Sequence, residues 1–148
     1  LNPGKGSYVC GEKNDSRAIL MKPLTGMNKS GKAVKEFCIN QGLLLSNVHV
    51  IVDDIDLPLG KLRIRPKGGD GCHRGMESII YQNRDNNFPR IRFGIAVGSK
   101  LRPSEQYVLK DFKKSDQNLA DEMIVRAADA AELIFEDGLN KAMNKYNA

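Results

Sequence analysis

The spacing of apolar and polar positions changes several times along the chain, and each change predicts a different element. Val48–Val52 is a continuous apolar run that ends in acidic residues, which is typical of a buried strand. Basic and apolar residues alternate in Lys61–Lys67, which predicts a half-exposed strand. Arg90–Val97 predicts another strand, and Ser7–Cys10 with Arg17–Met21 predicts a β-hairpin.

Three stretches have helical spacing instead. Ser30 is placed to cap a helix that runs to about Gln41, where Gly42 would stop it. Gly75–Tyr81 predicts a short helix. A long amphipathic helix, ended by Gly138 and followed by a last turn or two, is predicted by Leu119, Met123, Ala127, Ala130 and Ile134.

Strands that alternate with helices predict an α/β fold, here a single domain with a mixed, twisted sheet flanked by helices. The chain has 148 residues, of which 41% are hydrophobic and 28% charged, as in one ordinary globular domain. No apolar run is long enough to span a membrane. Cys10, Cys38 and Cys72 are too far apart to indicate a zinc site or a disulfide framework.

The net charge of +5 suits an anionic partner such as nucleic acid. Alternation puts four cations of the predicted strand on one face, and these would repel one another unless an anion were bound there. The cations are Lys61, Arg63, Arg65 and Lys67. A phosphate-binding face and a merely solvated face both fit this pattern.

Two loops carry further candidates. Gly68–Gly75 is glycine-rich, so a ligand can approach its backbone closely, but its spacing is neither that of a P-loop nor that of a dinucleotide site. Within it, His73 fits a surface residue or a substrate contact equally well. Asp53, Asp54 and Asp56 follow an apolar strand, where acids bind a metal, orient a base or cap a turn.

Taken together and in order, these blocks resemble the bacterial-type peptidyl-tRNA hydrolase family. Its members read N-P-G, T-R-H-N-x-G, M-N-x-S-G-x-A-V, D-[DE]-x-D-L-P-x-G, a basic strand, G-x-G-x-H-N-G and R-x-R-x-G-I-G. The chain matches all of these but one. The matching blocks are Leu1–Gly4, Lys22–Val34, Asp53–Gly60, Lys61–Lys67, Gly68–Gly75 and Arg90–Gly98.

The departures from the family pattern are specific. The T-R-H-N-x-G block is absent together with the helix that should follow it, and the strand expected before Leu1 is missing too. Arg74 stands where the family has asparagine, and Gly26 stands where it has an aromatic residue. We expect an internal segment to be missing from the sequence near Lys5, because a sheet without a strand and its covering helix would expose apolar surface.

The resemblance implies hydrolysis of the ester between peptide and tRNA, with no cofactor and no metal. The absent histidine would be the general base, Asp53 would orient it, and Asn28 and Asn2 would position water or substrate. The resemblance assigns substrate contacts, some of them to the acceptor-end phosphate, to Met27, His73, Arg74, Arg65 and Arg92.

The resemblance also predicts the setting of the protein: peptidyl-tRNA as partner, no membrane, a monomer, and a cytoplasmic or organellar location in chloroplast or mitochondrion. A non-catalytic RNA-binding relative, such as an organellar intron-splicing cofactor, is the alternative. Arg74 and the absent histidine favour that alternative, whereas Asp53, Asn28 and Asn2 favour the enzyme. The other histidine, His49, has an apolar strand context and is expected to be structural.

Overall fold

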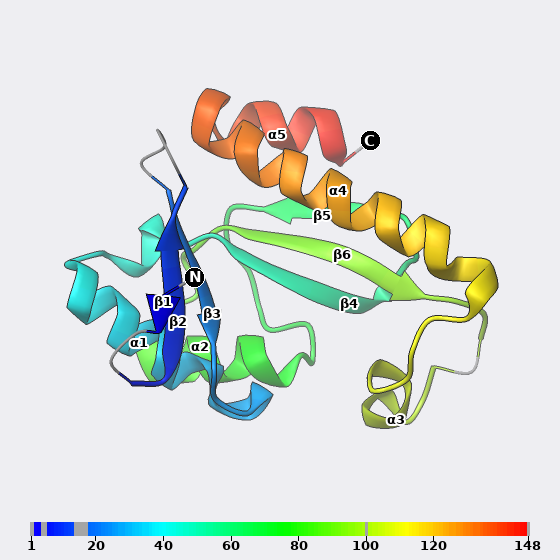
Figure 1. The fold of residues 1–148 in the computed structure, drawn as a ribbon, viewed down its shortest axis with the longest axis horizontal. Helices are drawn as coiled ribbons and strands as arrows, with labels where there is room; N and C mark the ends of the chain where they lie inside the picture. The colour runs from blue at the N-terminus through cyan, green and yellow to red at the C-terminus, as the bar shows by residue number, and fades with distance from the viewer. Residues whose placement is uncertain (1, 4–5, 14–17, 100, 148) are drawn as a thin grey trace. The chain divides into compact units, whose positions relative to one another are not determined.

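The structure is a computed structural model that describes residues 2–3, 6–13, 18–99 and 101–147 (Figure 1). The chain divides into two compact units. The first unit contains Leu1–Val48 and Lys67–Phe88, and the second contains His49–Pro66 and Pro89–Ala148. Each unit is described by itself below.

The first unit contains a small antiparallel sheet of three strands in the order β1-β2-β3, formed by β1 (Asn2–Pro3), β2 (Tyr8–Glu12) and β3 (Ile19–Pro23). The predicted hairpin is confirmed. Its strands extend further than predicted, because Gly11 and Glu12 remain paired with β3. The turn predicted between the two strands falls largely on residues 14–17, and these residues, like the predicted junction at Lys5, lie outside the described part of the chain.

Two helices complete the first unit, α1 (Ser30–Gln41) and α2 (Arg74–Asn83). Helix α1 ends at Gln41 as predicted, and Gly42 follows with a φ of 64°, a conformation that glycine adopts without strain. The helix begins one residue earlier than predicted. The predicted capping role of Ser30 is wrong. Ser30 is already the first helical residue, and its Oγ donates to the Met27 carbonyl oxygen at 2.8 Å, within a short 3₁₀ turn, η1 (Met27–Lys29).

The two helices of the first unit lie side by side and run in the same direction. The Gly31 N–H donates to Ser78 Oγ at 3.0 Å, and Lys35 Nζ donates to the Gln82 carbonyl oxygen at 3.3 Å. A Cβ at Gly31 would collide with the Ser78 carbonyl, so only glycine permits this approach. The beginnings of α1 and α2 therefore lie at the same end of the pair.

The second unit contains a three-stranded sheet in the order β4-β6-β5. Its strands are β4 (Val50–Pro58), β5 (Leu62–Arg65) and β6 (Arg90–Ala96). Strand β6 runs parallel to β4 and antiparallel to β5, so the sheet is mixed. Together with the helices, this confirms the predicted α/β fold.

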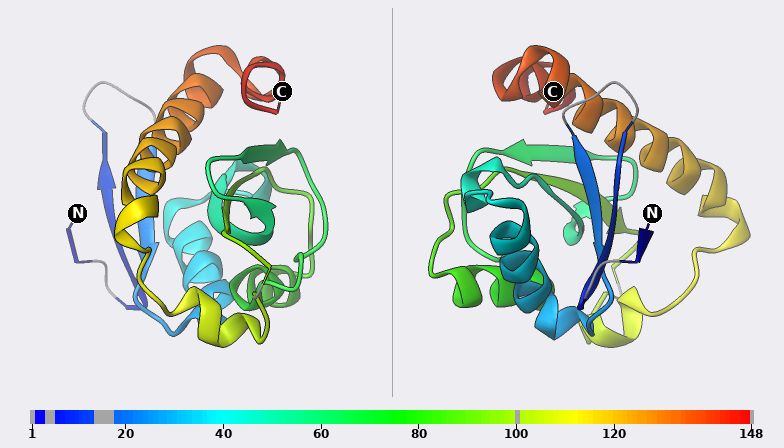
Figure 2. Two further views of the ribbon diagram at one scale, coloured as in Figure 1. Left: turned by 90° about the vertical axis from the view of Figure 1, so that its right-hand side faces the viewer. Right: turned by 60° about the vertical axis from the view of Figure 1, so that its left-hand side comes forward.

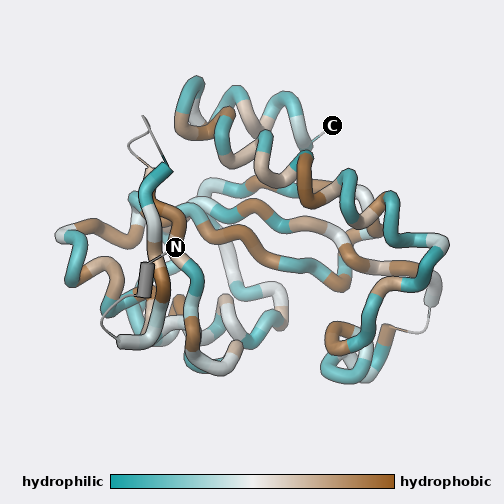
Figure 3. The backbone as a smooth tube through the Cα atoms, viewed as in Figure 1, coloured by the Kyte–Doolittle hydropathy of each residue, from teal (hydrophilic) through white to brown (hydrophobic). Residues whose placement is uncertain are grey.

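Helices α4 (Lys114–Asp137) and α5 (Leu139–Tyr146) lie on one side of this sheet (Figures 1 and 2). Hydrophobic stretches run along β4 and β6 (Figure 3). The buried core joins the sheet to both helices through Leu62, Ile64, Ile91, Met123, Ala127, Ala130, Ile134, Ala142 and Tyr146. No helix in the described part of the chain is both long enough and apolar enough to span a membrane.

Several predicted bounds in the second unit were wrong. Strand β4 does not stop before the acids but runs through them to Pro58, because Asp53 and Asp54 stay paired with β6. Strand β5 is shorter than predicted, and Lys61 and Lys67 lie outside it. Leu119 of α4 is exposed rather than part of the core. A short helix, α3 (Ser104–Val108), was not predicted at all.

We expect Gly31→Ala to lower the free energy of unfolding by about 1–3 kcal/mol, because the new methyl group must push α1 away from α2. Alanine favours helices over glycine, so helix propensity alone predicts the opposite sign. Urea denaturation followed by circular dichroism measures the change. The exposed neighbour Lys32→Ala is the control, and a stabilised Gly31→Ala variant would show that the helices do not approach so closely.

Candidate functional site

In the first unit, the shared end of α1 and α2 brings Met27 and His73 together around Gly75. A Cβ on Gly75 would lie 2.7 Å from Met27 Sδ and 2.9 Å from His73 Cε1. Residue 75 must therefore be small, and its two neighbours line the same spot. The structure thus places two of the predicted substrate contacts side by side, although they are 46 positions apart in the sequence.

His73 is the N-cap of α2, and its ring has a defined hydrogen-bonding state. The Nδ1 atom accepts from the Gly75 N–H at 3.1 Å and from the Met76 N–H at 3.2 Å. An atom that accepts two hydrogen bonds carries no proton, so in the neutral imidazole the hydrogen is on Nε2. His73 is therefore positioned to donate a hydrogen bond through Nε2, and in this state it is not a proton acceptor for water.

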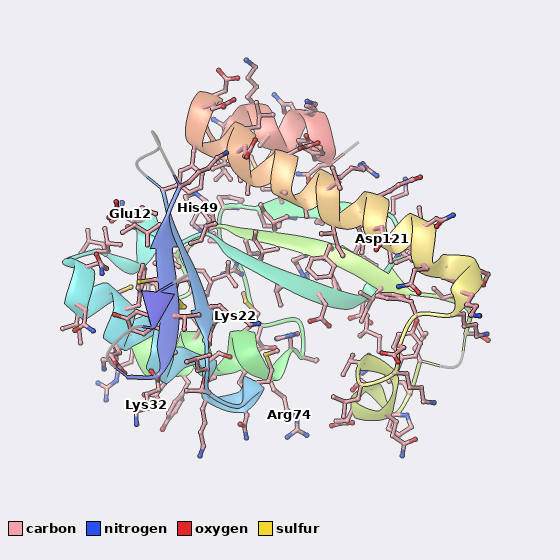
Figure 4. All side chains as sticks on the ribbon, in the orientation of Figure 1. Glu12, Lys22, Lys32, His49, Arg74 and Asp121 are labelled. Carbon is pink, nitrogen blue, oxygen red and sulfur yellow. The ribbon has the colours of Figure 1, made fainter. Side chains whose placement is uncertain are left out.

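The other predicted residues of the first unit lie close by in sequence. Asn28 is exposed in η1, between Met27 and the start of α1. Arg74 is the first residue of α2, and its side chain extends away from the ribbon (Figure 4). Asn2 pairs with Cys10 through β1, but its side chain lies outside the described residues.

In the second unit, four arginines share one face of the sheet. The register pairs Arg63 with Arg92 and Arg65 with Arg90, and directly paired residues point to the same side. This corrects the predicted composition of the basic face. Two of its cations come from the neighbouring strand β6, and Lys61 and Lys67 are not on the sheet.

A buried acid within β4 balances part of this charge. Asp54 Oδ2 lies 2.9 Å from Arg92 Nε, and Asp54 Oδ1 accepts the Asp56 N–H at 2.9 Å. The Arg92 side chain remains 29% exposed, so part of its guanidinium stays accessible. The sequence analysis did not assign this role to Asp54. The sequence signal for this role was the presence of three acids in four positions, together with the R-x-R pattern of the strand that pairs with them in the structure.

Arg90 is the most enclosed of the four arginines. Burial lowers its pKa below the ordinary arginine value, and the charge of Arg92 lowers that pKa further. The exposure of the arginine side chains therefore increases across the face, from the buried Arg90 to the exposed Arg65. An anion from solvent therefore meets Arg65 and part of Arg92 first.

Asp53 lies on the other face of the same sheet. It pairs with Phe93, which packs against the core beneath α4 and α5, whereas Asp54 and Arg92 point to the opposite side. Asp53 is half-buried and belongs to β4 rather than to a turn after it. The predicted catalytic acid and the predicted phosphate contacts thus come from opposite faces of one sheet.

The candidate residues divide between the two units. The first unit contributes Asn2, Met27, Asn28, His73 and Arg74, and the second contributes Asp53, Arg65 and Arg92. Among the described residues, no group of three or more His, Cys, Asp or Glu side chains is arranged to hold a metal ion. The candidate side chains provide hydrogen-bond donors, a carboxylate and guanidinium groups.

The family model described as "Peptidyl-tRNA hydrolase" matches residues 3–148. The chain belongs to the peptidyl-tRNA hydrolase family. A peptidyl-tRNA hydrolase of Thermoanaerobacter sp. is 45% identical over 144 residues, which cover 97% of this chain and 74% of that protein. A peptidyl-tRNA hydrolase of Desulforudis audaxviator is 42% identical over 138 residues, covering 93% of this chain and 69% of the relative.

A solved structure agrees with this assignment. The crystal structure of peptidyl-tRNA hydrolase from Acinetobacter baumannii is similar with a TM-score of 0.82 and 31% sequence identity. The match covers 94% of this chain and 70% of that chain. The resemblance that the motifs indicated, and the fold that it implied, are therefore confirmed.

The capping role of His73 gives a prediction about stability. His73→Ala should lower the free energy of unfolding by about 1 kcal/mol, because α2 loses its N-cap acceptor. His73→Asn should stay close to the parent, since an asparagine side chain caps equally well. Thermal denaturation of both variants measures the difference. Equal losses of stability in the two variants would show that the ring, and not its cap bonds, stabilises the helix.

Proposed function

We propose that this member of the family hydrolyses the ester bond between peptide and tRNA in peptidyl-tRNA, and that its two units supply different parts of the task. Ester hydrolysis needs an activated water, donors for the oxyanion and a grip on the leaving tRNA. The observation that carries the proposal is the family match together with the grouping of Met27, His73 and Gly75 at one end of α1 and α2.

In the first unit, Asn28 positions the water or the ester carbonyl, and Asn2 contacts the substrate. His73 donates from Nε2 to a substrate oxygen, because its Nδ1 is engaged by the helix backbone. Met27 and Arg74 border the same place and contact the peptide or the RNA. These roles require donors and apolar surface, and none of them requires His73 to take up a proton.

In the second unit, Asp53 orients the general base of the family, a histidine that this sequence lacks. A carboxylate that accepts the Nδ1–H of a histidine fixes the tautomer whose Nε2 takes a proton from water. The exposed Arg65 and the accessible part of Arg92 hold a phosphate of the acceptor end. The basic face thus binds the RNA, while the opposite face presents Asp53 to the base.

Exposed apolar side chains of the second unit support the proposal that an internal segment is missing from the sequence. On the helix-covered side of the sheet, apolar side chains stay exposed: Ile51 on β4 is 47% exposed, and Ile124 and Phe135 on α4 are 60% and 52% exposed. In the described sheet, β4 is an edge strand that pairs only with β6. A further helix and strand would cover this surface and bring a histidine close to Asp53.

A non-catalytic RNA-binding role is the second candidate. The exposed Arg74 at the start of α2 favours it, because a cation there attracts the phosphates of RNA. On this reading the arginine face and the glycine-rich loop bind RNA, and no hydrolysis follows. The two candidates differ in a single measurable quantity, the rate of ester cleavage at saturating substrate.

The first functional prediction concerns turnover. The 148-residue chain should cleave N-acetyl-aminoacyl-tRNA slowly, and insertion of a family T-R-H-N-x-G segment between Gly4 and Gly6 should raise the rate by about 10²–10⁴-fold, the usual contribution of a general base. The restored activity should resist excess chelator. Asp53→Asn in the restored protein should remove most of the gain with little change in tRNA affinity.

Three results would contradict this proposal. A restored protein that loses activity with chelator and regains it with a divalent ion would mean that a metal activates the water. A restored protein that binds tRNA but gains no rate would favour the RNA-binding alternative. An Asp53→Asn variant with normal turnover would mean that Asp53 does not orient the base.

The second functional prediction concerns the arginine face. Arg65→Ala should weaken tRNA binding and reduce the slope of log affinity against log salt by roughly 0.9, the value for one lost phosphate contact. Hydrolysis of a minimal substrate without the acceptor phosphate should be unaffected. Arg126→Ala is the matched control, because Arg126 lies on α4 and donates to the Gly60 carbonyl oxygen. Equal slopes for Arg65→Ala and the parent would mean that the face is only solvated.

A further inference from the structure

A second cationic feature lies in the first unit, at the far end of the paired helices from Met27 and His73. The end of α2 and the middle of α1 enclose a depression lined chiefly by polar side chains. Its lining includes Lys35 from α1, and Tyr81, Gln82, Arg84 and Asn86 from the end of α2 and the following loop. The function proposed above uses none of these residues.

The backbone at Arg84 is the first unusual observation. Arg84 ends α2 with a φ of 52° and a ψ of 33°, the left-handed region in which side chains are disfavoured. The neighbouring helix α1 ends in the same conformation with Gly42, which adopts it without strain. The chain therefore places an arginine where glycine would cap the helix at lower cost.

Lys35 adds a second cation at a fixed place. Its Nζ donates to the Gln82 carbonyl oxygen at 3.3 Å, which holds the ammonium over the end of α2. The negative end of a helix dipole accounts for one or two cations at this place. It does not account for the third component, the Tyr81 ring, which is 78% exposed beside them.

An exposed aromatic ring that lines the same depression as two cations has the chemistry that binds a nucleotide. A base stacks on the ring, and the phosphates on either side of the base meet the cations. The lining also contains one acid, Asp85, whose Oδ1 accepts the Asn87 N–H at 2.8 Å, and the two cations outnumber it. The charge of the unit also fits RNA, because it contains ten basic and six acidic residues, whereas the second unit contains thirteen and twelve.

We propose that the depression formed by Lys35, Tyr81 and Arg84 is an auxiliary RNA-binding site that takes an unstacked nucleotide of the tRNA substrate. Tyr81 supplies the stacking surface, and Lys35 and Arg84 contact the flanking phosphates. The inference rests on the proposed function for its ligand. It adds an RNA contact that is independent of the arginine face of the second unit.

The test measures the binding of unacylated tRNA, and of a short single-stranded RNA, by fluorescence anisotropy across a salt series. Tyr81→Leu should weaken binding by about 5- to 150-fold, the range for loss of one stacked base, with the salt slope unchanged. Arg84→Gly should reduce the slope by roughly 0.9. Lys141→Met, which removes an exposed cation of α5, should change neither quantity.

Arg84→Gly distinguishes an RNA-binding role of Arg84 from a role in ending α2 alone, because glycine is the better cap at a φ of 52°. The variant should be at least as stable as the parent in urea while it binds RNA more weakly. If it is more stable and its RNA affinity and salt slope equal those of the parent, Arg84 and Lys35 serve only the end of α2 and the inference is wrong.

The controls also distinguish this inference from the proposed function. If binding depends on Arg65 but not on Tyr81 and Arg84, the auxiliary site is wrong and the proposed function stands. If the parent binds neither tRNA nor the single-stranded RNA, both are overturned. If Tyr81 and Arg84 matter for RNA binding but the restored protein does not hydrolyse peptidyl-tRNA, the site stands and the protein is an RNA-binding relative.

Discussion

The close approach of α1 to α2 is the constraint on which the first unit depends. Gly31 lets the backbones meet, and its N–H is satisfied by Ser78 Oγ from the other helix. Because the two helices are parallel, this one contact aligns both of their beginnings. Met27, Asn28 and His73 are grouped by it, although they come from two distant motifs. Close packing therefore explains the glycines at positions 31 and 75 as well as ligand access does.

The second unit depends in a comparable way on the ion pair between the buried Asp54 and the half-buried Arg92. An unpaired carboxylate within a sheet would be costly, and so would four arginines on one face without an acid among them. The pair satisfies Asp54 and fixes the orientation of Arg92. On this face the guanidinium group of Arg65 and part of that of Arg92 stay accessible to solvent. The same residues thus supply a structural ion pair and the surface proposed to bind phosphate.

The sequence predicted most elements of the fold but not what joins them. Periodicity located the end of α1 at Gln41 and its start to within one residue, and it located β6 to within one residue of its end. It failed at Asp53 and Asp54, because polar residues ended the apolar run while the strand continued through its pairing with β6. It also failed for Lys61 and Lys67, since alternation shows which residues share a face but not where the neighbouring strand stops. Site residues followed from motifs, whereas the cap bonds of His73 and the role of Asp54 depend on contacts between distant segments.

Neither histidine of this chain fits the role of general base that the proposed function requires. His73 accepts two backbone hydrogen bonds through Nδ1, so taking up a proton there would uncap α2. His49 precedes β4, and its ring packs on Phe135 with a centroid distance of 5.4 Å. Four residues of extended chain separate it from Asp53, which is about 13 Å along a strand and far beyond a hydrogen bond. On the proposed mechanism the base therefore comes from residues that this sequence lacks, and we propose that they would pack against the exposed apolar side chains of the second unit.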